Sequence, residues 1–410
     1  LGKFKNHNDL YLVNFLCKSL IMVSFHLLVF ISITNAQEHF LITDPLEGQE
    51  IFEAKGCQQC HGIRGRGGDI AKDLGWHEYY GSVFELAADL WNHSPIMREV
   101  MEELHIERPA FTEDDMSKLM SFLYYQRYLD KTGDVLKGKK LLSEKGCLKC
   151  HSVRQKGGTV GRRLDRLAVH VTPLFMAQAM WNHGPDMEKK MKELHITWPR
   201  FDNEEVVDLT NYLRILRMES PRQAVYLQPG NPASGKNLFK TKGCIHCHSV
   251  EGEGGGIALD VTQMELNKSV TEIAGRMWNH SLVMMSIMKK EKMEWPQFQG
   301  QEMGDLISYL YFINFTGQRG DLEQGKKVFK AKGCITCHSK REGMEPVGPD
   351  LSELKSLRSP TQLAQIMWNH APNMETKMSE LDMEWPQFSK GEMANLFEFL
   401  LNLNGSTEKN

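Results

Sequence analysis

The sequence predicts an all-α protein made of four tandem copies of one helical module, and two observations carry this prediction. The pattern Cys-x-x-Cys-His occurs four times, beginning at residues 57, 147, 244 and 334, and each copy is followed at constant spacing by Trp-Asn-His and then by a proline. Apolar residues recur at helical spacing, and no run alternates as a strand would. With 41% apolar and 25% charged residues, the composition is that of a globular protein.

The repeat also predicts where the segments begin and end. We expect an export segment at 1–36, modules at 44–131, 134–218, 235–317 and 321–404, a linker at 219–234 and a tail at 405–410. We number the modules 1 to 4 in chain order. Modules 1 and 2 share Glu-Leu-His-Ile, whereas modules 3 and 4 share Met-Glu-Trp-Pro-Gln-Phe. With the long linker in the middle, this predicts two halves, each made of two neighbouring modules.

Each module is expected to contain several helices. A short helix ends at Lys-Gly just before the first cysteine, since glycine commonly ends a helix. A second helix leads into Trp-Asn-His. Proline stands two residues after that histidine in three modules (Pro95, Pro185 and Pro372) and predicts the start of a new helix, whereas module 3 has Leu282 there. A last helix follows a Pro-x-Phe turn.

The charge and the N-terminal segment restrict where the protein acts. The net charge of −3 and the pI near 6.6 provide no basic field for binding nucleic acid. Three lysines precede an apolar run at 20–33, and Thr34-Asn35-Ala36 follows it, which predicts a secretory signal cleaved before Gln37 and a periplasmic or otherwise extracytoplasmic protein. The alternative is an uncleaved membrane anchor at 10–33. Cleavage would change the net charge to −5, since three lysines and one aspartate leave.

The repeated motif indicates covalent attachment of haem. Two thiols three positions apart can add to both vinyl groups of one haem, and the adjacent histidine can bind its iron. A zinc site would need a second such pair within each module, and a thioredoxin-like redox pair belongs beside a β-α-β unit, which is absent from the sequence pattern. We therefore expect four haem c groups. The attachment residues are Cys57, Cys60, Cys147, Cys150, Cys244, Cys247, Cys334 and Cys337, and the proximal ligands are His61, His151, His248 and His338.

The modules resemble class I cytochrome c domains over residues 44 to about 404. The resemblance rests on the haem motif, on a glycine and a large apolar residue in the first helix, and on an aromatic residue in the last helix (Phe122, Tyr212, Tyr309 and Phe399). It implies that the first and last helices cross with these residues in contact. That family usually has Gly-Pro-x-Leu after the motif, and the proline carbonyl helps to orient the proximal histidine. Only module 4 has it, at Gly348, Pro349 and Leu351, whereas Lys72, Arg162 and Leu259 take the place of Pro349 in modules 1 to 3.

The second axial ligand of each iron has several candidates. Methionine, which raises the potential of a haem relative to histidine, occurs four residues after the Trp-Asn-His histidine in every module, and this position is our first choice. These residues are Met97, Met187, Met284 and Met374. The alternatives are the methionines eight residues after it (Met101, Met191, Met288 and Met378), the histidines themselves (His93, His183, His280 and His370), Met293 and Met383 in modules 3 and 4, and mixed ligation. The tryptophan of the triplet is expected to pack in a haem pocket rather than to relay electrons.

These features predict an exported tetrahaem c-type cytochrome that carries electrons between redox partner proteins and is not an enzyme. Its acidic charge favours partners with basic docking patches. It would contact a membrane only if the N-terminal segment is uncleaved. The alternatives are a haem enzyme, such as a peroxidase or an oxyanion reductase with one open iron, and a haem subunit of a membrane oxidoreductase.

Overall fold

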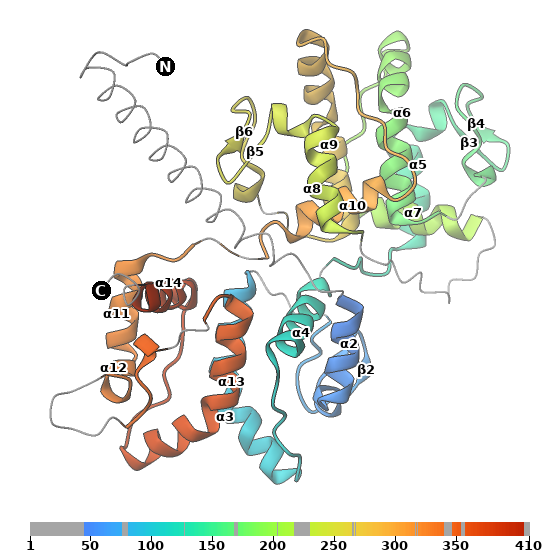
Figure 1. The fold of residues 1–410 in the computed structure, drawn as a ribbon. Coiled ribbons are helices and arrows are strands. Elements are labelled where there is room, and N and C mark those ends of the chain that lie inside the picture. The colour runs from blue at the N-terminus through green and yellow to red at the C-terminus, as the bar shows by residue number, and fades with distance from the viewer. Residues whose placement is uncertain are drawn as a thin grey trace, which may run out of the picture. The chain divides into compact units, whose positions relative to one another are not determined.

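The computed structural model describes residues 45–75, 81–126, 128–167, 171–202, 204–216, 230–264, 266, 268–315, 317, 319–339, 347–353 and 357–405. The predicted export segment, linker residues 219–229 and tail residues 406–410 lie outside these ranges. Within them, thirteen α-helices are joined by loops and short hairpins, which confirms the all-α prediction (Figure 1). None of the helices described there is long and apolar enough to cross a bilayer.

The same elements recur in every module in the same order. The first helices are α2 (Pro45–Ala54), α5 (Val135–Glu144), α8 (Pro232–Thr241) and α11 (Leu322–Ala331). The long helices are α3 (Val83–Glu103), α6 (Pro173–Glu193), α9 (Val270–Lys290) and α13 (Pro360–Glu380). The last helices are α4 (Glu113–Tyr125), α7 (Glu205–Leu216), α10 (Glu302–Phe312) and α14 (Glu392–Gly405).

The cysteines lie in a tight helical turn after the first helix. The turn is 3₁₀ in modules 1 to 3 and the four-residue helix α12 (Cys334–Cys337) in module 4. A two-residue antiparallel hairpin follows in modules 1 to 3, although the sequence predicted no strand. The hairpins pair β1 (Gly62–Ile63) with β2 (Arg66–Gly67), β3 (Ser152–Val153) with β4 (Lys156–Gly157), and β5 (Ser249–Val250) with β6 (Glu253–Gly254).

The first and last helices of each module cross in close contact, as the resemblance implied. In module 1, a Cβ added to Gly48 would lie only 2.0 Å from the Lys118 carbonyl oxygen, so the crossing requires glycine. The rings of Phe52 and Phe122 meet beside it with their centres 5.7 Å apart. Gly138, Gly235 and Gly325 make equally close approaches in the other modules. The crossing therefore fixes the cysteine turn relative to the last helix.

Each long helix begins at a hydroxyl side chain that caps it. Ser82 accepts a hydrogen bond from the Phe84 N–H, and Thr172, Ser269 and Ser359 cap the other three helices in a similar way. The helix then continues for 21 residues through Pro95 in module 1, and likewise through its counterparts in modules 2 and 4. The predicted start of a new helix at these prolines is therefore wrong.

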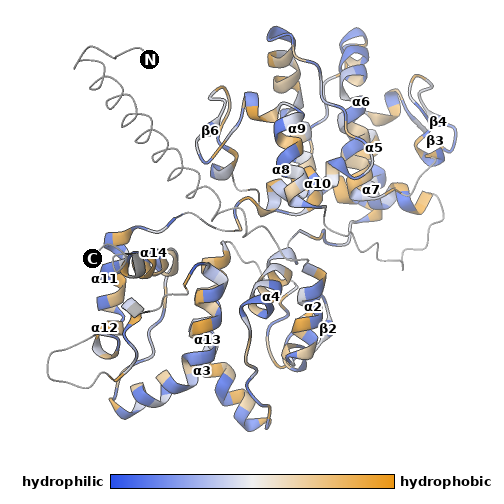
Figure 2. Ribbon diagram, in the orientation of Figure 1, coloured by the Kyte–Doolittle hydropathy of each residue, from blue (hydrophilic) through white to orange (hydrophobic). Residues whose placement is uncertain are grey.

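The modules pack in pairs that are not neighbours in sequence. Helix α3 lies along α13, so module 1 packs on module 4, and α6 lies along α9, so module 2 packs on module 3 (Figure 1). Figure 2 shows hydrophobic and hydrophilic residues interspersed along these helices, as expected for elements half covered by a neighbour. The prediction that neighbouring modules form the halves is wrong. The sequence likenesses instead distinguish two module types, and each pair contains one of each type.

A cluster of aromatic side chains joins module 1 to module 3. Tyr124 and Tyr128 at the end of module 1 contact Tyr311 and Phe315 at the end of module 3, and all four are 2% exposed or less. The backbone bonds across this contact are reciprocal. The Val83 N–H that begins α3 donates to the Phe315 carbonyl at 2.7 Å, and the N–H that begins α9 donates to the Tyr128 carbonyl at 3.0 Å. These contacts link the modules in the order 2, 3, 1, 4, and an ion pair between Lys131 and Glu204 at 3.4 Å adds a contact between modules 1 and 2.

Candidate functional site

The first two residues of each Trp-Asn-His triplet dock one module on its partner. Trp91 Nε1 donates to the Pro386 carbonyl at 2.8 Å, and the Asn92 amide exchanges two hydrogen bonds with the Phe388 backbone at 2.9 and 2.7 Å. The contact is reciprocated, since Trp368 Nε1 donates to the carbonyl of Pro109 at 2.7 Å. The same bonds join Trp181 to Pro296 and Trp278 to Pro199 in the other pair. The Pro-x-Phe turn of every module is therefore held by the triplet of its partner.

The docked tryptophan also stacks on the residue that precedes the partner's proline. This residue is tryptophan in three modules, with ring centres 4.1 Å apart for Trp91 and Trp385 and 4.2 Å apart for Trp278 and Trp198. Trp181 and Trp295 form the third stack, with ring centres 4.4 Å apart. The sequence predicted that the triplet tryptophans pack in haem pockets. The structure places Trp91 in the wall of a cavity of module 4, so it packs against the partner's site and also forms the interface.

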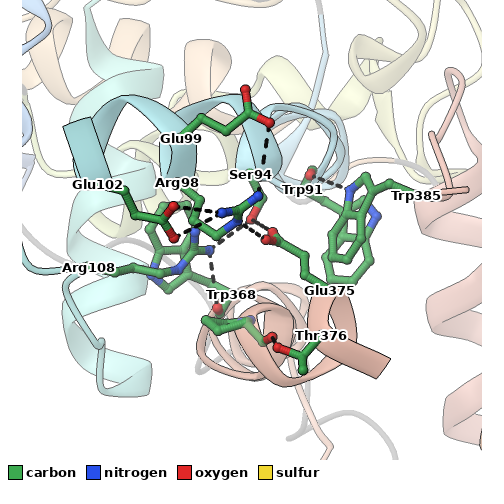
Figure 3. Close-up of polar contacts among 11 residues, drawn as sticks. Trp91, Ser94, Arg98, Glu99, Glu102, Arg108, Trp368, Glu375, Thr376 and Trp385 are labelled. Atoms are coloured by element: carbon green, nitrogen blue, oxygen red, sulfur yellow. Dashed lines mark hydrogen bonds and ion pairs between the residues drawn. The ribbon is translucent and has the colours of Figure 1, made fainter. Parts of the chain in front are cut away.

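Module 1 has arginine at the fourth of these stacking positions. The Arg108 guanidinium lies over the Trp368 ring, 3.8 Å from its centre, and donates to Ser94 Oγ and to the Trp368 carbonyl (Figure 3). Burial lowers the pKa of Arg108 below its usual value. Close by, Arg98 pairs with Glu375 of module 4. The interface between modules 1 and 4 therefore has one stacked indole pair and a half-buried guanidinium, whereas the interface between modules 2 and 3 has two stacked indole pairs.

The prolines inside the long helices free a backbone carbonyl that can accept a hydrogen bond from the indole Nε1 of the stacked tryptophan. Proline has no N–H, so it leaves the carbonyl four residues earlier without its helical donor. For Pro95 that carbonyl belongs to Trp91, and it accepts from Trp385 Nε1 at 3.1 Å. The corresponding bonds run from Trp295 Nε1 to the Trp181 carbonyl at 3.0 Å and from Arg108 to the Trp368 carbonyl at 3.3 Å.

Module 3 has no such proline, and its partner indole lacks an acceptor. Leu282 keeps the N–H that closes the regular helical bond to the Trp278 carbonyl, and Ser281 Oγ donates to the same carbonyl at 2.6 Å. Trp198 Nε1, which stacks over this position, is buried without a hydrogen-bond partner in the described part of the chain. Among the three stacked indoles, the one whose Nε1 has no partner in the described residues is thus the one that stacks on the module without proline.

The histidine of every Cys-x-x-Cys-His motif has its tautomer fixed by a backbone carbonyl. Nδ1 lies 2.8–3.0 Å from the carbonyl oxygen eleven residues later, which belongs to Lys72, Arg162, Leu259 and Pro349 in turn. A carbonyl can only accept, so Nδ1 carries the proton and Nε2 keeps a lone pair for a metal. The proline expected from the resemblance is therefore not required, because the other three residues present the same carbonyl.

We call the two residues that end at this carbonyl, such as Ala71 and Lys72 in module 1, the carbonyl strap. A second backbone hydrogen bond holds the strap in place. The residue before each carbonyl donates its N–H to the carbonyl of the second cysteine, at 3.0 Å for Ala71 and also 3.0 Å for Gly348. Gly348 lies so close to the proximal ring that an added Cβ would be 2.8 Å from the His338 Cε1 atom. The imidazole is thus pinned between its own cysteine turn and the strap.

In module 4 these groups line one cavity of about 410 Å³. Both thiols and the proximal imidazole form one side, and Trp91, His370 and mostly apolar side chains complete it. Burial raises the pKa of the Cys334 thiol, the first of its pair, to about 11. Two thiols, one imidazole with its Nε2 available and an apolar enclosure match the donor set that a covalently attached haem requires. The residues present therefore fit the predicted group.

Two kinds of candidate for the second axial ligand lie around the same cavity. Met374, Met378 and Met383 all line it in module 4. The triplet histidine faces the proximal one in each module, with ring centres 6.3 Å apart for His61 and His93 and 6.1 Å apart for His338 and His370. The structure thus brings every predicted candidate of module 4 to one site.

A lysine before each cysteine pair clamps the Pro-x-Phe turn of its own module, a role that we did not predict from the sequence. Lys242 Nζ donates to the Gln297 carbonyl at 2.8 Å, lies 5.5 Å from the centre of the Phe298 ring and pairs with Glu302 at 2.8 Å. Lys55, Lys145 and Lys332 make the same three kinds of contact. The available signal was Lys-Gly before all four motifs, which we interpreted only as a helix end.

We expect Lys242→Met to lower the free energy of unfolding by about 1–2 kcal/mol at pH 7, because a partly exposed ion pair and a hydrogen bond to a carbonyl are lost. The hydrogen bond from Lys242 lowers the pKa of Glu302, so the ion pair stabilises the fold above the unfolded-state pKa of about 4.3 and is lost as pH falls through the folded value. Urea unfolding of the haem-loaded chain, followed by circular dichroism, should show a smaller difference at pH 3. The exposed Lys240→Met, at the end of helix α8 just before Lys242, is the control, and an equal loss there would contradict the clamp.

Comparison with known families agrees with this geometry. The family model described as Cytochrome c matches residues 135–217, 232–311 and 322–404, which are modules 2, 3 and 4. Module 1 lies outside these matches but contains the same helices, cysteine turn and histidine-to-carbonyl bond. No curated protein and no solved structure matched the chain.

Proposed function

Because the chain belongs to the cytochrome c family, we propose that it is an exported tetrahaem cytochrome that carries electrons between redox partner proteins. The observation that carries this proposal is the fourfold recurrence of one site. In all four modules, including the one outside the family matches, two thiols precede a histidine whose Nδ1 is fixed by a carbonyl. Repeated haem sites on one chain would let electrons pass from one site to the next.

The haem would supply one-electron chemistry, and the chain would set its surroundings. The cysteines would hold the group covalently, so each module can stay small. The carbonyl that bonds Nδ1 of the proximal histidine would leave Nε2 available to the iron. The Trp-Asn contacts bring two sites together in each pair, and Trp91 belongs to the wall of its partner's cavity.

The proposed location and partners rest on the sequence. The N-terminal segment has the pattern of an export signal, and covalent haem attachment agrees with an extracytoplasmic protein. The net charge after cleavage, −5, and the haem propionates favour partners that present basic docking patches.

A haem count tests the proposal. The full chain is produced in a host with a c-type maturation system, and the intact mass and the pyridine haemochrome absorbance are measured. We expect four haems per chain and the loss of residues 1–36. Changing Cys57 and Cys60 together to alanine should lower the count to three, since module 1 would lose its attachment. A chain without haem, or one that binds zinc instead, would overturn the proposal.

The spin state and carbon monoxide binding of the same preparation distinguish an electron carrier from a haem enzyme. A carrier should have four low-spin haems and bind carbon monoxide poorly after reduction. One high-spin haem that binds carbon monoxide would instead favour a peroxidase or an oxyanion reductase.

A further inference from the structure

The rings of the proximal histidine and the triplet histidine are separated by nearly the same distance in all four modules. Their centres lie 6.3 Å apart in module 1, 6.3 Å in module 2, 6.4 Å in module 3 and 6.1 Å in module 4. The ring planes are inclined to each other by 57–68°. Such agreement across modules that differ at many neighbouring positions indicates that the spacing is built into the fold.

This separation is the one that a shared metal ion requires. With metal–nitrogen bonds of about 2 Å, the centres of two imidazoles on opposite sides of one ion lie about 6.3 Å apart. Direct contact between the rings would bring them closer, and an intervening water would leave the proximal Nε2 without a metal. The proximal Nδ1 is already bonded to a carbonyl, which leaves Nε2 as the nitrogen available to such an ion.

The docking contacts hold the opposite histidine in this place. Trp91 and Asn92, which precede His93, are bonded to the backbone of module 4. In module 4, Trp368 and Asn369, which precede His370, are bonded in turn to the Pro-x-Phe turn of module 1. The triplet thus contains two interface residues and one residue aimed at its own module's site. The position of the imidazole depends on the partner module.

The methionine candidates line the same cavity, but they start from other positions of the chain than the triplet histidine. Met374 is four residues after His370 on α13, one helical turn or about 6 Å farther along the axis. Only one of the two side chains can be the second ligand of the same iron, and the 6.1 Å separation between the His338 and His370 rings favours the imidazole. Met374 and Met378 then serve as soft, polarizable packing in the cavity wall.

We infer that each haem iron is bound by two histidines, with His93, His183, His280 and His370 as the second axial ligands. The inference rests on the proposed function, since it requires haem at each motif. It replaces the methionine ligands that the sequence favoured. Bis-histidine ligation implies lower potentials than histidine–methionine ligation, so the protein would donate electrons more readily than a typical member with methionine.

Spectroscopy of the haem-loaded full chain tests the inference. The oxidised protein should be low-spin at all four haems and should lack the long-wavelength methionine-to-iron charge-transfer band. His370→Ala should leave the haem count at four but convert about a quarter of the haem to a high-spin form that binds carbon monoxide. His370→Met should restore a low-spin iron, introduce the charge-transfer band and raise the potential of one haem.

The matched control is Met374→Leu, which keeps the volume of the side chain and removes the sulfur. It should leave the spin state and the charge-transfer region unchanged. A charge-transfer band in the parent protein, a high-spin haem in Met374→Leu, or four low-spin haems in His370→Ala would each overturn the inference. These results differ from failure of the proposed function, in which the intact mass would show no haem.

Discussion

Trp91→Ala should lower the free energy of unfolding of the pair formed by modules 1 and 4 by about 3–5 kcal/mol. The Trp91 side chain is 4% exposed, stacks on Trp385 and donates to the Pro386 carbonyl. Its removal would leave a cavity in the interface and a carbonyl without its donor. Because the pair of modules 2 and 3 keeps its own contacts, we expect two unfolding transitions in urea, only one of which moves. Circular dichroism of the haem-loaded chain measures both.

Two phenylalanine substitutions separate the hydrogen bond from the packing. Trp91→Phe keeps an aromatic ring but loses the bond to Pro386, which should cost about 1–2 kcal/mol. Trp198→Phe removes an Nε1 that is buried without a partner among the described residues, so its cost should be smaller. If Trp91→Ala moves neither transition, or if both phenylalanine variants cost the same, the docking role of the triplet is wrong.

Leu282→Pro should be tolerated, although a proline inside a helix ordinarily costs about 3 kcal/mol. The substitution removes the N–H that competes for the Trp278 carbonyl and lets that carbonyl accept from Trp198 Nε1. It gives module 3 the arrangement that Pro95, Pro185 and Pro372 already produce, in helices of the same length. We expect the free energy of unfolding to change by less than about 1 kcal/mol.

The exposed Ser286→Pro on the same helix is the matched control and should show the full cost of a helix-interior proline. Combining Leu282→Pro with Trp198→Phe removes the donor that the freed carbonyl would accept from, so the double variant should be less stable than the two single changes predict. If Leu282→Pro costs as much stability as Ser286→Pro and shows no coupling to position 198, then Trp198 Nε1 does not replace the Leu282 N–H as the donor to the Trp278 carbonyl.

The fold and the proximal half of each site could be predicted from the sequence because they are local. The motif places two thiols and an imidazole within five residues, and the helices follow from apolar spacing and from glycine. The pairing of modules could not be predicted, since Trp91 and Pro386 are bonded across 295 positions. The position of the prolines inside a continuous helix could not be predicted for the same reason. The hydrogen-bond donor that replaces the missing N–H of Pro95 is Trp385, which belongs to another module.

In the proposed tetrahaem carrier, the contacts between modules would also influence the route of an electron. Modules 2 and 3, 3 and 1, and 1 and 4 are joined by the contacts described above, so an electron that followed these contacts would pass through the modules in an order that differs from their order in the polypeptide. Modules 2 and 4 would then be the ends of this route, and modules 1 and 3 would be its interior relays. The Tyr124–Tyr311 contact is one of those that join the two interior modules.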